Sequence, residues 1–529
     1  MRRLAILFAS LAAAGALALI LSRSVAEFTH RDEHQFIVPG LLTMREGLMP
    51  YRDYPLFHMP YLVLVHGVLG ELTGWPLLTA RVLTAVAAWG TLVLLGIYAF
   101  RRLAPLPRWR FWIALAIPLL LLSEPIFAAT ITYAWNHAVP LFFAVLAFAL
   151  HCRALRAEDG RWLCLASGAS IAVAACMRLT FLPLIAPFAA ALLLLGRRDR
   201  LARWKRAGFF AAGAAFAALP AAFFLVSAPE QFLFGNLEYP KLSTVWRRYP
   251  IWKENLSTFV DPVRGFLDPL HEGFHGRSID KKLRRTVAVT VRDNWPIFAA
   301  FISSLVVGAI ASLRARRWEE PLALLALTLP FVILGCLAPS RFHIQYFFAL
   351  MPFLALGMVE LSRGAALWLP CRAAAPAVLI IALSLISAVL GAREYACVRT
   401  LFRFESWGAV VAHRLAEQLR ADLGPGRILT LDPLLVAEGG APVYPEVSSG
   451  EFGWRTAHLL SQAKRRRLKM VCAFDIDTWL RERPPDGIVL DWTDPQLTPP
   501  LIDWARANGF RSRQRVGLLE LWSRDGKSP

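Results

Sequence analysis

Apolar segments of about 20 residues, the length that crosses the hydrocarbon core of a bilayer, recur along the first three quarters of the sequence. We expect about eleven membrane-spanning helices in this part of the chain. Their predicted ranges are 4–21, 77–100, 111–129, 137–151, 162–177, 179–195, 207–227, 295–313, 321–337, 344–361 and 373–390. The first range is typical of an uncleaved signal anchor, and a cleavable signal peptide ending near Ala26 is the alternative.

Arginines gather in every second loop between these segments. Arg101-Arg102, Arg197-Arg198 and Arg316-Arg317 mark three such loops. Because arginine-rich short loops stay in the cytoplasm, this spacing predicts a cytoplasmic N-terminus. It leaves three segments outside: 22–76, 228–294, and the chain from about residue 393 onward.

The pattern changes after residue 392, where long apolar runs stop. Alternating short segments predict strands at 427–432, 487–492 and 516–522, and helices at 476–483 and 501–508. We therefore predict a mostly α protein with two domains. A polytopic transmembrane helical bundle covers 1–392, with 56–72 forming one or two interfacial helices, and a soluble extracytoplasmic α/β domain covers 393–529.

Composition supports a membrane protein. The 529 residues are 56% hydrophobic and 18% charged, with a mean hydropathy of +0.46, whereas soluble proteins carry about 25% charged residues. A net charge of +20 would suggest nucleic acid in a soluble protein, but these arginines set topology, so we expect no nucleic-acid partner. The seven cysteines show no CxxC spacing, which predicts no zinc site, although Cys397 and Cys472 both lie outside and could pair.

Ionisable and polar residues cluster at the predicted outer ends of the spans, where burial is costly. Snorkelling and helix capping explain each residue alone, but the set favours a membrane enzyme whose cavity opens outward. The set comprises Asp32, Glu33, Glu124, Asn136, His137, Arg178, Arg341 and His343.

A carboxylate beside arginines at this depth suits glycosyl transfer from a lipid-linked sugar phosphate. The carboxylate accepts the proton of the attacking hydroxyl. Arginine stabilises the departing phosphate through paired hydrogen bonds. The carrier's phosphate would sit at the headgroup level predicted for Arg178 and Arg341.

Several short motifs in this sequence resemble those of a known enzyme family. Asp32-Glu33, the Pro50–Asp53 stretch (PYRD), Arg81 near the start of the second span, and the turn 340–346 are similar to the outer loops of GT-C glycosyltransferases. These enzymes use polyprenyl-phosphate sugars and include protein O-mannosyltransferases, the lipid A aminoarabinose transferase and lipopolysaccharide galacturonosyl transferases. The histidines flanking Asp32-Glu33 do not match the family pattern.

The resemblance implies a function and roles for these residues. The substrates would be a polyprenyl-phosphate-linked sugar and an acceptor hydroxyl on a glycan, lipid or protein outside a bacterial cytoplasmic membrane. Asp32 would be the catalytic base, with Glu33 beside it. Arg341, Arg178 and Arg81 would bind the donor phosphate. The acceptor-binding or supporting residues would be Asp53, Tyr51, His58, Glu124 and His343.

Three alternatives stay open. His271–His275 (HEGFH) matches the zincin signature of a metalloprotease, although Gly273 inside it favours a loop. A transporter or flippase is a second class, disfavoured because the charges lie at one edge of the bilayer rather than at its midplane. We expect no required cofactor and no resident metal, although His30 and His34 could hold a divalent cation.

Overall fold

A computed structural model describes residues 2–195, 200–246, 277–315, 319–339, 343–369, 374–490, 496–516 and 519–524. The chain forms two compact units. The first comprises Met1–Ala26, Arg81–Pro220 and Lys282–Arg403. The second comprises Glu27–Ala80, Ala221–Lys281 and Phe404–Pro529, so the first outer loop groups with the C-terminal region.

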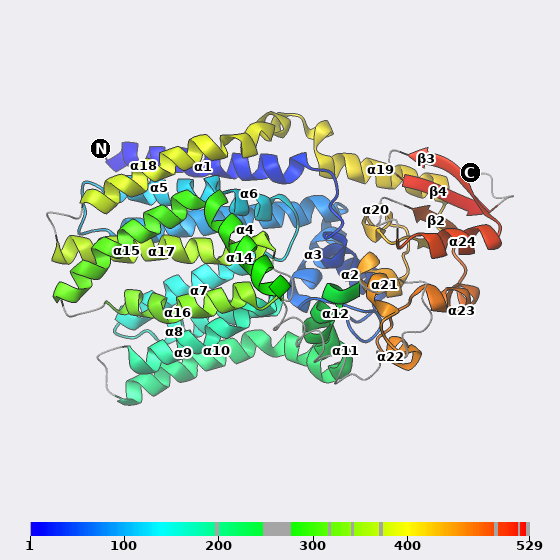
Figure 1. Ribbon diagram of the computed structural model, residues 1–529, viewed down its shortest axis with the longest axis horizontal. Helices are drawn as coiled ribbons and strands as arrows, with labels where there is room; N and C mark the ends of the chain where they lie inside the picture. The colour runs from blue at the N-terminus through cyan, green and yellow to red at the C-terminus, as the bar shows by residue number, and fades with distance from the viewer. Residues whose placement is uncertain are drawn as a thin grey trace. The chain divides into compact units, whose positions relative to one another are not determined.

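Long apolar helices make up the first unit and run side by side (Figure 1). Within the described residues, eight helices are long and apolar enough to cross a membrane. They are α1 (Arg2–Ala26), α4 (Pro76–Arg102), α7 (Ala138–Arg156), α10 (Arg200–Ser227), α15 (Trp295–Ala315), α16 (Glu320–Leu337), α17 (Leu350–Trp368, preceded by η5, Ile344–Ala349) and α18 (Ala374–Gly391, followed by η7, Ala392–Phe402). Their positions confirm eight of the predicted spans.

The remaining three predicted spans are helical but shorter or broken. α8 (Arg161–Met177) and the pair η1 (Leu179–Leu184) and α9 (Ile185–Leu194) are short apolar helices. The prediction of one continuous helix over 111–129 is wrong, because α5 (Arg110–Ser123) and α6 (Pro125–Thr132) meet at a bend of 68°. Pro125 causes the break: it disfavours a helical conformation at the preceding residue, and Glu124 is extended there.

Charged residues from three of the predicted cytoplasmic loops meet in one network. Arg102 donates to both oxygens of buried Glu360, at 2.7 and 2.5 Å, and to Glu319 at 2.7 Å. Arg363 donates to Glu319 at 2.8 Å and to the carbonyl of Arg102 at 2.9 Å. These residues from three predicted loops therefore lie close together in the first unit.

Two helices of the first outer loop pack tightly in the second unit. α3 (Pro60–Thr73) occupies most of the predicted interfacial segment, while α2 (His34–Glu46) was not predicted. The helices cross at Gly40 and Gly67, where a Cβ on Gly40 would fall 2.1 Å from the carbonyl oxygen of Val63. From the second large loop the structure describes α11 (Pro229–Leu233), η2 (Phe234–Glu238), α12 (Tyr239–Val245) and α14 (Arg277–Asp293).

A four-stranded sheet lies in the C-terminal region, with strand order β1-β2-β4-β3. β1 (Ile428–Leu429) is parallel to β2 (Gly487–Leu490), and β4 (Leu519–Arg524) is antiparallel to β2 and to β3 (Phe510–Val516). The predicted single final strand over 516–522 is wrong, because β3 and β4 form two antiparallel strands there. The accompanying helices are α19 (Gly408–Leu423), α20 (Pro433–Glu438), α21 (Glu451–Ala457), α22 (Gln462–Arg467), α23 (Ile476–Glu482) and α24 (Pro499–Ala507), with short 3-10 turns η8 (Phe404–Ser406), η9 (Pro445–Val447) and η10 (Ala473–Asp475).

Candidate functional site

Asp32 and Glu33 lie in a tight turn directly ahead of α2. The backbone N–H of Glu33 donates to the carbonyl of His30 at 2.9 Å, and its carboxylate accepts from the backbone N–H of His30 at 2.9 Å. Glu33 is fully buried, whereas the side chain of Asp32 is 33% exposed. The helix N-terminus favours negative charge at this position. Asp32 is thus the more accessible carboxylate, and Glu33 holds the turn.

The histidines on either side of these acids face different partners. Nδ1 of His30 accepts from the backbone N–H of Asp32 at 3.1 Å. His34 is turned toward Ser449 and Asp432 of the C-terminal region. Among the residues that the structure describes, no group of three His, Cys, Asp or Glu side chains is placed to hold a metal ion.

Asp53, Tyr51 and His58 shape the PYRD segment and its surroundings. Asp53 accepts from the backbone N–H of Met49 at 2.8 Å and pairs with Arg52, whose hydrogen bonds lower the pKa of the Asp53 carboxyl. Tyr51 is buried with a φ of 67°, and its hydroxyl donates to the carbonyl of His58 at 2.5 Å. These contacts give Asp53 and Tyr51 a part in fixing the loop, and their predicted role toward an acceptor stays a prediction.

Arg178 is a buried charged residue of the first unit with neutral and aromatic neighbours. It follows α8 with an extended backbone, and only 7% of the residue is exposed. Its guanidinium donates to the side-chain oxygen of Asn136 at 2.7 Å and to the hydroxyl of Thr180 at 3.1 Å. The Tyr346 and Phe348 rings lie 5.5 and 5.1 Å from its Cζ. Within the described ranges, no carboxylate pairs with it.

Three other predicted residues lie in the first unit. Arg81 is fully buried, donates to the carbonyl of Ser24 at 3.3 Å and faces the ring of Tyr133 at 5.7 Å. Glu124 is buried at the α5–α6 bend and accepts from the hydroxyl of Ser387 at 3.3 Å. The ring of His343 lies edge-on to Tyr346, with centroids 5.4 Å apart.

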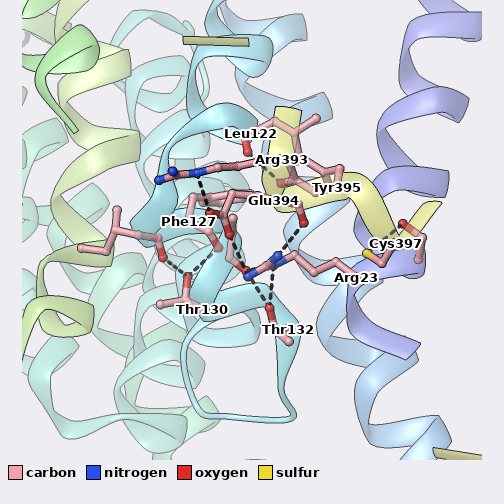
Figure 2. Close-up of polar contacts among 12 residues, drawn as sticks. Arg23, Leu122, Phe127, Thr130, Thr132, Arg393, Glu394, Tyr395 and Cys397 are labelled. Atoms are coloured by element: carbon pink, nitrogen blue, oxygen red, sulfur yellow. Dashed lines mark hydrogen bonds and ion pairs between the residues drawn. The ribbon is translucent and has the colours of Figure 1, made fainter. Parts of the chain in front are cut away.

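A cluster of polar contacts around Arg23, which the sequence analysis did not predict, joins α1, α6 and η7 (Figure 2). Arg23 donates to the carbonyl of Ala128 at 3.1 Å and to the hydroxyl of Thr132 at 2.9 Å, and it pairs with Glu394 at 3.0 Å. The signal was available, because an arginine at the predicted outer end of a span violates the cytoplasmic preference and requires a partner.

The predicted residues therefore divide between the two units. Asp32, Glu33, Tyr51, Asp53 and His58 belong to the second unit. The first unit holds Arg81, Glu124, Arg178 and His343. Arg341 and the HEGFH segment lie outside the described residues. Cys397 and Cys472 are both free thiols.

The second unit also contains an open cleft of about 610 Å³. Its lining includes Arg45, Gly74, His413, Arg420 and Glu438. None of the predicted site residues lines it, so this cleft does not mark the predicted site.

Comparison with solved structures defines the class of fold. No protein-family profile matches this sequence, and a search of curated proteins finds no match. The fold is the one seen in GT-C membrane glycosyltransferases, which confirms the predicted fold. ArnT from Cupriavidus metallidurans bound to undecaprenyl phosphate is similar with a TM-score of 0.61, at 14% identity over 98% of each chain.

Other solved structures are also similar. ArnT from the same organism in the apo state gives a TM-score of 0.58 at 15% identity over 97% of each chain. The oligosaccharyltransferase of Archaeoglobus fulgidus in the apo form is less similar, with a TM-score of 0.47 at 12% identity, over 82% of this chain and 64% of that one. At these identities the likeness defines the fold.

Proposed function

We propose that this chain is an integral membrane glycosyltransferase that moves a sugar from a polyprenyl-phosphate carrier to an acceptor hydroxyl on the extracytoplasmic face. The carrying observation is Arg178, a buried guanidinium whose hydrogen-bond partners among the described residues are all neutral. A buried arginine without a counter-ion is unfavourable, and insertion scales put the cost at roughly 2.5–3.5 kcal/mol. A bound phosphate would offset that cost.

Arginine suits this ligand by geometry as well as charge. A guanidinium offers parallel N–H donors that match two phosphate oxygens, which a lysine cannot reproduce. Asn136 and the two aromatic rings restrict how the Arg178 fork can turn. The ArnT structure was solved with undecaprenyl phosphate, a ligand of the same chemical class. Arg341 and Arg81 are further proposed phosphate ligands.

Asp32 is the proposed general base. The acceptor oxygen forms a bond to the anomeric carbon as its proton passes to the Asp32 carboxylate. The bond between the anomeric carbon and the phosphate oxygen breaks, and polyprenyl phosphate leaves as an anion. Glu33 is the proposed partner acid. Asp53, Tyr51, His58, Glu124 and His343 remain the proposed acceptor-binding or supporting residues, and no cofactor is required.

Asp32→Asn tests this assignment, because it keeps the size of the side chain and removes the proton acceptor. We expect turnover with a polyprenyl-phosphate sugar to fall by about 10²–10⁴-fold while the protein still inserts and folds. Asp159→Asn is the matched control: Asp159 is exposed and pairs with Arg161 in a predicted cytoplasmic loop, so its turnover should stay at the wild-type level. Near-normal transfer by Asp32→Asn would contradict the assignment.

A further inference from the structure

α2 lies against the C-terminal region at both of its ends. Asp432, which directly precedes α20, meets His34 in the first turn of α2, with Oδ1 and Nδ1 3.3 Å apart. Arg45, in the last turn of α2, donates to the carbonyl of Ala437 in α20 at 2.6 Å. The helix that follows the Asp32–Glu33 turn is thus held by residues from the other end of the sequence.

His34 makes the contact nearest to the acids. Its side chain is 1% exposed, and Nε2 lies 3.1 Å from the carbonyl oxygen of Ser449, to which it can only donate. Nδ1 lies 3.3 Å from Oδ1 of Asp432, a distance at which the two side chains form an ion pair when the imidazole is protonated. A glutamine in place of His34 can keep the Ser449 contact, but it carries no charge and loses the ion pair.

Gly450 shows that the backbone is shaped around this ring. Its φ is +60°, a conformation that side chains rarely adopt. A Cβ on Gly450 would fall 2.2 Å from Nε2 of His34 and 2.6 Å from the carbonyl oxygen of Leu431. Only glycine allows the C-terminal segment to approach His34 this closely. Ser449 adds a second link, because its hydroxyl donates to the carbonyl of Pro55 at 3.3 Å.

The Asp32–Glu33 turn has little freedom to move apart from His34. The carbonyl of Glu33 accepts from the backbone N–H of Phe36 at 3.0 Å, which joins the turn to the first turn of α2. Any displacement of His34 is therefore transmitted to both acids. A shift of about 1 Å in a reacting group can cost roughly 10²-fold in rate.

We propose that the C-terminal region holds the Asp32–Glu33 turn in its reactive position through His34 and Asp432, which makes both of them positioning residues. The inference rests on the proposed function and assigns a task to the C-terminal region. It also explains the histidine after Asp32-Glu33 that the family resemblance left without a role.

The test uses the full chain reconstituted in lipid, with His34→Gln and Asp432→Asn as variants. Both remove the ion pair; glutamine can still donate to Ser449, and the Asp432 change leaves His34 intact. We expect kcat to fall by about 10–100-fold in both variants. The KM for the polyprenyl-phosphate sugar should stay within about twofold, because the proposed phosphate ligand Arg178 belongs to the other unit.

His413→Gln is the matched control. His413 forms the same kind of pair, with Nδ1 2.9 Å from buried Glu438, and it also lies in the second unit. Glu438 is at the other end of α20 from Asp432, so this pair does not touch the Asp32–Glu33 turn. We expect His413→Gln to lose about as much thermal stability as His34→Gln and to keep its kcat. That result would show that the lower kcat of His34→Gln comes from a displaced Asp32–Glu33 turn and not from a general loss of stability.

Hydrogen exchange in the peptide 29–37 gives a readout independent of turnover. Exchange there should speed up in His34→Gln and Asp432→Asn and not in His413→Gln. The inference is overturned if kcat stays within twofold of wild type in Asp432→Asn, or if His413→Gln loses as much kcat as His34→Gln. Asp32→Asn in the same series separates the two proposals: full activity there defeats the proposed function, whereas loss there with normal Asp432→Asn defeats only this inference.

Discussion

Arg102 and Arg178 are both buried arginines of the first unit, yet their surroundings differ. Arg102 donates to Glu360 and Glu319, and the hydroxyl of Tyr98 also donates to Glu360 at 2.6 Å. Arg178 has an amide, a hydroxyl and two aromatic faces. The charge of Arg102 is balanced by the protein itself, whereas the charge of Arg178 is not balanced by any carboxylate in the described part of the chain.

The difference distinguishes a structural charge from a functional one. A buried guanidinium that already has two carboxylate partners gains little from a further anion, and removing a partner leaves an expensive unpaired charge. A guanidinium held by neutral groups keeps its orientation and can still attract an anion. Burial alone does not distinguish the structural charge of Arg102 from the functional charge of Arg178.

Glu360→Gln should have the largest effect. It leaves Arg102 and Arg363 to share Glu319, so that one positive charge of the network is unbalanced, and we expect the free energy of unfolding to fall by about 3–5 kcal/mol. Thermal unfolding in detergent measures this change. Donor affinity of the protein that remains folded should not change, and a selective loss of donor binding would mean that Arg102, too, serves a ligand.

Asn136→Asp would place a carboxylate beside Arg178, as Glu360 and Glu319 lie beside Arg102. The new carboxylate would stand where an amide oxygen now lies 2.7 Å from the guanidinium. Because it would compete with phosphate, binding of polyprenyl phosphate should weaken by about 100-fold, while thermal stability is kept or raised. Isothermal titration or scintillation proximity measures the affinity. Unchanged affinity would show that Arg178 does not meet the phosphate.

Arg178→Lys should have a smaller effect on the same affinity. Lysine keeps the charge and loses the planar fork, and hydrogen bonds to charged groups contribute roughly 1.5–3 kcal/mol each. We expect donor binding to weaken by about 10–100-fold with little change in thermal stability. Arg102→Lys is the matched control, for which stability should fall and affinity should not. The reverse pattern would exchange the two roles.

The smallest expected effect concerns His413, whose imidazole pairs with buried Glu438. Its hydrogen bond to Glu438 raises the pKa of the imidazole above its ordinary value of about 6.5. A raised pKa in the folded state stabilises the protein below the unfolded value, and this contribution is lost as pH rises through the folded value. The Tm difference between wild type and His413→Gln should therefore be larger at pH 6 than at pH 8. A difference that grows with pH would contradict the assignment.

The sequence predicted local features well. The apolar segments were correct because hydrophobicity over about 20 residues is a local signal. The bend at Glu124 was also signalled locally by Pro125, and the continuous span was predicted against that signal. α2 was missed because Pro39 and Gly40 lie inside it, and its helix is supported by packing on α3 rather than by its own sequence.

The site was harder to predict because its partners are distant in sequence. No sequence pattern near residue 34 indicates that His34 contacts Asp432 or Ser449. No pattern near residue 178 indicates that Arg178 contacts Asn136. The sequence could identify which residues are costly to bury, including Arg178. It could not tell whether a carboxylate would neutralise each one, and that distinction carries the functional argument.

The most direct test of the account is whether Arg178 holds a lipid-linked phosphate. Native mass spectrometry of the purified wild-type protein, Asn136→Asp and Glu360→Gln, each incubated with polyprenyl phosphate, measures the bound fraction. The account predicts a bound lipid phosphate in wild type and in folded Glu360→Gln, and little or none in Asn136→Asp. Equal binding by wild type and Asn136→Asp would contradict it.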